Sequence, residues 1–159
     1  MWQKTLVIIL LFYFFALLQN NFFAHFNLFG ASLNLVFILF FLMVFFKDPK
    51  GTPGNYQIIF LAAVAGIFLD IFSFTYLGPS IVVLLIIGFL LKKIQSLLKN
   101  RENKYPFVYF LPLFIIFLLA YKLLLGMTSF GVETIFFIIY NSLIASAVFY
   151  IYKWQKFIK

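Results

Sequence analysis

The 159-residue sequence has no cysteine, and only 10% of its residues are charged. The lack of cysteine excludes disulfides, thiolate metal sites and a cysteine nucleophile. Soluble globular proteins carry about 25% charged residues, so the shortage of charge argues against a soluble domain. The chain is instead 65% hydrophobic and 23% aromatic, with a mean hydropathy of +1.11. A domain of this size could not bury so many apolar side chains, so most of its surroundings must be lipid.

Six apolar segments, separated by short polar or turn-forming links, make up most of the chain. A membrane-spanning helix needs about 20 residues, so six such helices leave no room for an additional soluble domain. We expect an all-α integral membrane protein, a bundle of six transmembrane helices in which residues 1–159 form a single polytopic domain. The expected spans are 2–18, 31–46, 56–74, 79–98, 106–125 and 132–152.

The positions of the basic residues predict the orientation of these spans. Cytoplasmic loops of membrane proteins are enriched in Lys and Arg. With the N-terminus in the cytoplasm, all 12 basic residues except Lys122 fall in cytoplasmic segments. Trp2 and Trp154 then lie at the same interface, where indole rings prefer to be. We therefore expect both the N- and C-termini to be cytoplasmic.

Three ionisable residues fall near the outer ends of the third, fifth and sixth spans: Asp70, Lys122 and Glu133. A charge at membrane depth costs a few kcal/mol, so each is a candidate functional residue. Opposite charges at similar depth favour pairing, and we expect Lys122 to form an intramembrane ion pair with Asp70 or Glu133. The alternative is that these side chains extend to the outer headgroups.

The third span also carries a face of small residues. Ala62 and Gly66 are four residues apart, a spacing that lets two helix backbones approach closely in lipid. The helix that packs on this face belongs either to this chain or to a partner. Polar side chains in other spans are expected to hydrogen-bond across helices, namely Asn34, Asn141, Ser142 and Ser146.

No motif in the sequence indicates an enzyme. Catalytic zinc sites take three protein ligands, whereas this chain has one histidine and four acids in different segments. The sequence contains no nucleophile-elbow, zincin or P-loop motif. We expect no catalytic residues, no metal and no cofactor, and a solvated His25. Nucleic-acid binding is not expected either, since there is no basic stripe or stacking module.

The link after the fourth span is the most basic part of the chain. Lys92, Lys93, Lys99, Arg101 and Lys104 form a predicted cytoplasmic basic patch. Each Lys or Arg near an anionic leaflet contributes about 1 kcal/mol of attraction. Membrane lipid is therefore the expected contact, and an acidic cytoplasmic partner is the alternative.

Two regions resemble the bacterial rod-shape-determining MreD family. The first region is Gly-Ile-Phe-Leu-Asp at 66–70, followed by Leu77-Gly78 and the apolar run 81–91. It is similar to the family's pattern, in which glycine, aliphatic residues and an aspartate precede a Leu-Gly that opens the next span. Segment 18–35 resembles the family's N-terminal region, although the family usually has Pro-Asp where this chain has Leu33-Asn34. Chain length, span count and the basic link also agree.

The resemblance implies a non-enzymatic scaffold in the cell-wall elongation complex of the bacterial cytoplasmic (inner) membrane. MreD-like proteins associate with the bitopic protein MreC, and with it RodA, a penicillin-binding transpeptidase and, indirectly, MreB. A partner's transmembrane helix is expected to pack on the bundle. Asp70 and Gly78 are carried over from the family motif, and Gly66, Ala62 and Asn34 are further candidates for partner or helix packing.

The alternative is a substrate-binding membrane subunit of an energy-coupling-factor vitamin transporter. These subunits also have six spans, and the MreD family looks similar to them in fold. Their first span usually carries an alanine-rich face for the coupling subunit, whereas residues 6–16 of this chain contain one alanine, Ala16. The outer loops also offer few polar groups for a vitamin, so the scaffold is the favoured reading.

Overall fold

The computed structural model describes residues 2–26, 30–46, 54–73, 76–98, 106–126 and 131–157. In these ranges the chain folds into helices, which confirms the predicted all-α class. The α-helices are α1 (Trp2–Leu17), α2 (Leu35–Phe45), α3 (Asn55–Phe72), α4 (Pro79–Leu98), α5 (Pro106–Leu124) and α6 (Val132–Phe157). A π-helical turn, η1 (Leu18–Phe22), and a 3-10 turn, η2 (Phe23–Phe26), continue α1.

Four of the described helices are long and apolar enough to cross a membrane: α1 with its continuation, α3, α4 and α6. Their length and composition are those of membrane-spanning helices. The apolar part described for α5, Val108–Leu124, is shorter than these four, and α2 is the shortest. The predicted second span, 31–46, is helical only from Leu35 to Phe45. Eleven residues of α-helix measure about 16 Å, against a hydrocarbon thickness of about 30 Å.

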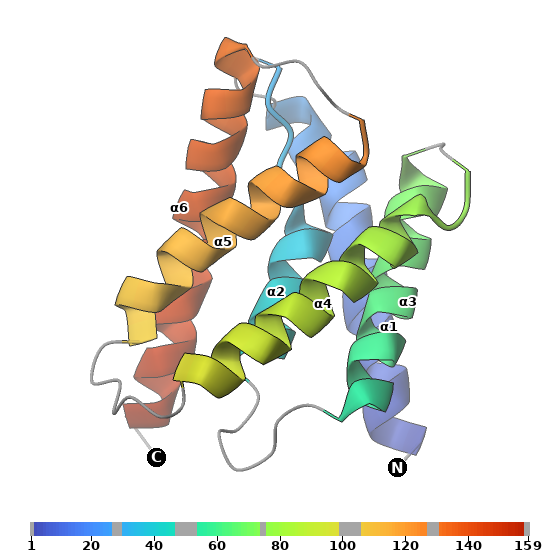
Figure 1. The fold of residues 1–159 in the computed structure, drawn as a ribbon. Helices are drawn as coiled ribbons and strands as arrows, with labels where there is room; N and C mark the ends of the chain where they lie inside the picture. Colours follow the sequence, from blue (N-terminus) through green and yellow to red (C-terminus); the bar gives the residue numbers. More distant parts are fainter. Residues whose placement is uncertain are drawn as a thin grey trace.

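The short helix α2 lies at the centre of the bundle and contacts all five other α-helices (Figure 1). Helices α4 and α5 cross one side of α2, while α1 and α6 lie on opposite sides of it (Figure 1). Helix α1 begins and α6 ends at the same end of the bundle (Figure 1), which we call the termini end. An even number of membrane crossings requires this arrangement.

Aromatic side chains of α2 fill the middle of the bundle. The rings of Phe37 and Tyr121 are 5.0 Å apart, and the Phe41 ring packs edge-on against Phe114 at 5.2 Å. Edge-to-face and tilted ring pairs of this kind add to the stabilisation from burial alone. Helix α2 is therefore an internal core element rather than a lipid-facing one.

The small-residue face of α3 packs against α4 within this chain. A Cβ added to Gly66 would lie 2.6 Å from the backbone N and Cα of Ile81, and Ala62 and Ala65 are fully buried. In lipid, such close approach supplies the van der Waals contact that holds helices together. Of the two possibilities for this face, the structure shows packing inside the chain.

Side-chain amides bond the backbone at both ends of α2. At its C-terminus, the Gln95 side chain of α4 donates to the carbonyls of Val44 and Phe45, at 3.3 and 3.0 Å. The last carbonyls of a helix have no partner within the helix, and leaving them unbonded in an apolar interior is costly. Gln95 therefore allows α2 to end inside the bundle.

Candidate functional site

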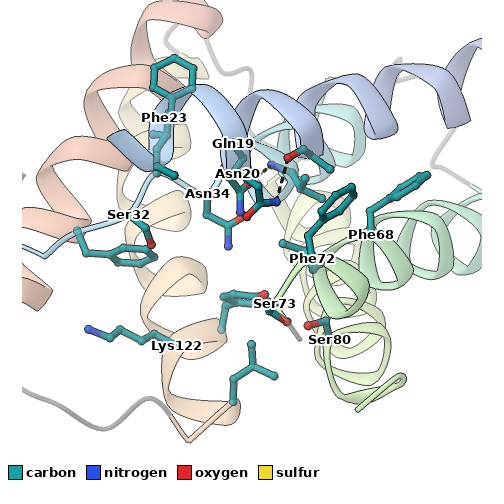
Figure 2. A pocket seen from close by; sticks show the side chains of 18 of the residues that line it. Gln19, Asn20, Phe23, Ser32, Asn34, Phe68, Phe72, Ser73, Ser80 and Lys122 are labelled. Carbon is teal, nitrogen blue, oxygen red and sulfur yellow. Dashed lines mark hydrogen bonds between the residues drawn. The ribbon is translucent and has the colours of Figure 1, made fainter. Parts of the chain in front are cut away.

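A cavity of about 940 Å³ lies at the end of the bundle opposite the termini, beside the N-terminus of α2 (Figure 2). Because α2 begins only at Leu35, the neighbouring helices extend past it and enclose this space. Residues 30–34 form part of the cavity wall and are not helical. Buried side chains such as Asn34 and Ser80 line the cavity deep in the bundle, and exposed residues such as Tyr76 and Glu133 line it near the surface.

Polar side chains bond the backbone where α2 begins. The backbone N–H of Asn34 donates to Asn141 Oδ1 at 2.7 Å, and the N–H of Val36 donates to Gln19 Oε1 at 3.3 Å. Asn34 Oδ1 in turn accepts the N–H of Phe37 at 3.0 Å, as an N-cap residue does. These bonds satisfy backbone donors that would otherwise be buried without a partner.

Asn141 of α6 holds segment 30–34 as well as the start of α2. Its Nδ2 donates to the Ser32 carbonyl at 3.2 Å and to the Phe137 carbonyl at 2.8 Å. Asn141 thus bonds across helices through its side chain, whereas Asn34 takes part through its backbone N–H and uses its side-chain oxygen to cap its own helix. Ser146 instead bonds to the Ser142 carbonyl within α6, and the buried Ser142 Oγ has no partner in the part of the chain that the structure describes.

Tyr121 connects three helices at the cavity. Its hydroxyl interacts with the side chains of Ser80, at the start of α4, and of Asn34, at the N-cap of α2. All three residues are buried and line the cavity. Helices α2, α4 and α5 therefore bring polar side chains together at the cavity.

Asp70 is fully buried near the end of α3 and binds the backbone at the start of α4. Its Oδ2 accepts the N–H of Gly78 at 2.6 Å, and its Oδ1 accepts the N–H of Ser80 at 3.1 Å. Pro79 lies between them and has no N–H to satisfy. Gly78 has φ +124°, a conformation that side chains other than glycine's rarely adopt. The motif Asp70…Gly78 therefore links two consecutive helices.

The predicted intramembrane ion pair is not formed in the part of the chain that the structure describes. Lys122 Nζ donates to Thr134 Oγ1 at 2.7 Å and lies 5.5 Å from the centre of the Phe137 ring. Among the described residues, Asp70, Lys122 and Glu133 form no salt bridge with one another. The physical reason is that the Asp70 carboxylate is already compensated by two backbone N–H groups and the positive end of the α4 dipole.

The expected partner-packing residues all act inside the chain. Asp70, Gly66, Ala62 and Asn34 are buried, and the N–H of the half-buried Gly78 is bonded to Asp70. A partner helix lying on the outside of the bundle would not touch these four buried residues. Their observed roles are helix packing and capping.

The basic patch is only partly described. Lys92 Nζ donates to Asn55 Oδ1 at 2.8 Å, which joins α4 to the start of α3, and Lys93 is exposed. Lys99, Arg101 and Lys104 lie outside the described residues. Figure 1 places the end of α4 toward the termini end of the bundle, away from the cavity.

Sequence reasoning missed the hydrogen bonds of three polar residues: Gln19 and Thr134 near the cavity, and Gln95 at the opposite end of α2. Each is an uncharged polar side chain near the end of an apolar segment, and that is the signal that could have drawn attention to them. In the described ranges no three His, Asp or Glu side chains gather closely enough to hold a metal ion. The site therefore offers hydrogen bonds, two charged groups and aromatic walls.

Comparison with known proteins identifies the family. No curated protein and no solved structure gives a significant match to this chain. The family model described as rod shape-determining protein MreD matches residues 2–159, essentially the whole chain. An all-helical bundle with four helices able to cross a membrane is compatible with this match. The chain belongs to the MreD family of rod shape-determining proteins.

Proposed function

We propose that this chain is a non-enzymatic scaffold of the cell-wall elongation complex in the bacterial cytoplasmic (inner) membrane. It packs against the transmembrane helix of an MreC-like bitopic protein, and through this partner it joins RodA, a transpeptidase and, indirectly, MreB. The observation that carries the proposal is the MreD match over residues 2–159, since that family is named for determining rod shape. The same match favours this function over a vitamin-transporter subunit.

The outer face of α1 is the proposed contact surface for the partner helix. Only one side of α1 packs on the bundle, through buried residues such as Phe12 and Ala16, and its neighbours there are α2 and α3. Of the four helices able to cross a membrane, α1 has the smallest buried share. The opposite side exposes apolar residues at helical spacing: Leu6, Val7, Leu10 and Phe14.

Van der Waals packing, rather than the hydrophobic effect, would hold a partner helix on this face. Lipid tails are as apolar as Leu side chains, so helices associate in membranes through close packing, hydrogen bonds and lipid entropy. The small-residue face of α3 is already covered by α4, which removes the surface that the sequence suggested for a partner. Large exposed side chains of α1, such as Leu10 and Phe14, remain available to pack against a partner helix.

The basic patch is proposed to face the cytoplasm and contact anionic lipid. Lys92 and Lys93 lie toward the termini end, and both termini are proposed to be cytoplasmic. Each such cation attracts an anionic leaflet by about 1 kcal/mol, and the attraction weakens with salt. This contact would orient the chain without specifying a partner.

Co-purification from native membranes tests the proposal. Tagged protein expressed at its normal level and solubilised in mild detergent should recover the MreC-like partner, detected by mass spectrometry. Replacing Leu6, Leu10 and Phe14 of α1 by alanine should lower that recovery at least fivefold. The matched control replaces Ile135, Ile139 and Leu143, which are exposed on α6, and should leave recovery unchanged. Equal recovery with both triple variants, or no partner with the unmodified chain, would overturn the proposal.

A further inference from the structure

Two opposite charges line the same cavity without pairing with each other. An ammonium group has three N–H donors, and Thr134 Oγ1 is the hydrogen-bond partner that the structure gives Lys122 Nζ. Glu133 is exposed, and its carboxylate forms no ion pair or hydrogen bond among the described residues. Both residues are part of the cavity lining. The cavity therefore presents one cation and one anion that retain capacity for a ligand.

Two amide side chains add an uncharged donor and acceptor to the cavity wall. Figure 2 shows Gln19 and Asn20 of η1 beside the cavity, close to Asn34. Gln19 uses its Oε1 for the backbone of Val36, and Asn20 uses its Nδ2 for the Ala16 carbonyl at 3.0 Å. In the described part of the chain, the Gln19 Nε2 donor and the Asn20 Oδ1 acceptor have no partner. A ligand that both accepts and donates hydrogen bonds would satisfy these two groups.

The size and remaining walls of the cavity suit a small molecule with an apolar part. Ligand pockets usually measure about 300–1,000 Å³ and are mostly apolar with a few polar groups, and this cavity measures about 940 Å³. Its aromatic lining includes Phe23, Phe68, Phe72 and Phe137. Aromatic rings accept apolar groups and also attract cations over their faces.

We propose that this cavity binds a small zwitterion, a molecule that carries both an ammonium and an anionic group. Lys122 holds the anionic group and Glu133 holds the ammonium, while Gln19 and Asn20 supply additional hydrogen bonds. A ligand with a single charge would pair with only one of the two residues, whereas a zwitterion can pair with both. This inference is independent of the proposed scaffold function and adds a ligand site to it.

The same chemistry has two sources, a phosphoethanolamine lipid headgroup or a free zwitterion in the aqueous phase. The surface beside the cavity suits a lipid, because Val132 and Ile135 of α6 are exposed next to Glu133 and can lie along acyl chains. The exposed Tyr76 also lines the cavity, so the cavity opens at the surface of the bundle and a soluble molecule is the second source to test. The experiment must therefore separate the two sources.

Native mass spectrometry of the purified chain, with defined lipids added, tests the proposal. Dioleoyl phosphatidylethanolamine, which is zwitterionic, should bind at least tenfold more tightly than dioleoyl phosphatidylglycerol, which lacks the ammonium. Soluble glycerophosphoethanolamine is titrated separately, with the midpoint of thermal unfolding as the readout. If phosphatidylethanolamine and glycerophosphoethanolamine both bind, the headgroup alone is sufficient for binding. If only phosphatidylethanolamine binds, the ligand comes from the membrane. Equal binding of the two lipids, or binding of neither zwitterion, overturns the proposal.

Charge-removing and charge-preserving variants locate the binding in the cavity. Lys122→Met and Glu133→Gln should each weaken phosphatidylethanolamine binding at least tenfold. Lys122→Arg keeps the cation. Thr134→Val removes the hydroxyl that Lys122 Nζ contacts but leaves the ammonium charge in place, so both variants should remain within about threefold of the unmodified chain. If Lys122→Met binds normally, or if Thr134→Val loses as much as Lys122→Met, the site is wrongly assigned. Recovery of the MreC-like partner should not change in any of these variants.

Discussion

The backbone N–H of Gly78 donates to the Asp70 carboxylate at 2.6 Å, so that a side chain near the end of α3 fixes the start of α4. The second carboxylate oxygen accepts the N–H of Ser80, on the other side of Pro79. An anion at a helix N-terminus is stabilised both by these N–H groups and by the helix dipole. This contact explains how a charge lies fully buried in an apolar segment without a cation beside it.

Replacing Asp70 by asparagine should destabilise the bundle by about 2 kcal/mol. Hydrogen bonds to a charged group contribute about 1.5–3 kcal/mol, and the amide would place an NH₂ donor against one of the two backbone N–H donors. The free energy of unfolding can be measured by titrating SDS into detergent-solubilised protein. Glu133→Gln removes a negative charge at the same end of the bundle but from an exposed side chain, so it should cost less than about 1 kcal/mol. Similar losses for the two variants would contradict the capping role of Asp70.

Gly66→Ala tests the close contact of α3 with α4. The added methyl group would lie 2.6 Å from backbone atoms of Ile81, which cannot move aside as a flexible side chain can. Overpacking of this kind costs about 1–3 kcal/mol, and we expect a loss in that range in the same SDS titration. Gly131→Ala is the matched control, since no atom lies within 4 Å of its added Cβ. An unchanged stability of Gly66→Ala would show that the helices are farther apart than the structure has them.

The polar contact between α2 and α6 should be worth more than an ordinary interhelical hydrogen bond. Asn141→Leu removes a donor to the Ser32 carbonyl and the acceptor of the Asn34 N–H, which is then left buried without that partner. Unsatisfied buried groups cost about 1–3 kcal/mol each, so we expect a loss of at least about 2 kcal/mol. Ser146→Ala removes a bond within α6 and should change stability by less than about 0.5 kcal/mol. Equal effects of the two variants would contradict this assignment.

Hydropathy and turn residues predicted the helical class and most helix positions, because lipid leaves few alternatives to helices for backbone hydrogen bonds. The second span is the exception. Its apolar composition is as compatible with a short core helix as with a full span, and the bonds of Gln19, Gln95 and Asn141 to its ends come from segments distant in the sequence.

The candidate site was less predictable than the fold. Asp70 was recognised as unusual, yet its partner turned out to be a backbone rather than Lys122, because sequence shows charges but not the N–H groups of a helix start. The cavity could not be predicted from the sequence, since it results from where α2 begins between longer neighbours. The sequence left open which helix packs on the small-residue face of Ala62 and Gly66, and only the three-dimensional structure shows that α4 approaches it at Gly66.

The absence of cysteine makes the proposed membrane orientation directly testable. A single cysteine in place of Tyr76, which is 91% exposed beside the cavity, should react with a membrane-impermeant maleimide in cells whose outer envelope has been permeabilised. A cysteine in place of Lys93, toward the termini end, should react only after the cytoplasmic membrane is opened. The opposite labelling order would place the cavity on the cytoplasmic side and contradict the proposed topology.

Position-specific photo-crosslinking in living cells tests the central claim, partner binding by the outer face of α1, most directly. A benzoylphenylalanine at Leu10 of α1 should crosslink to the MreC-like protein, identified by mass spectrometry of the crosslinked band. The same residue at Leu143, which is comparably exposed on α6, should give at most one-fifth of that product. A crosslink from Leu143 but not from Leu10 would contradict the account, as would the absence of the partner from both.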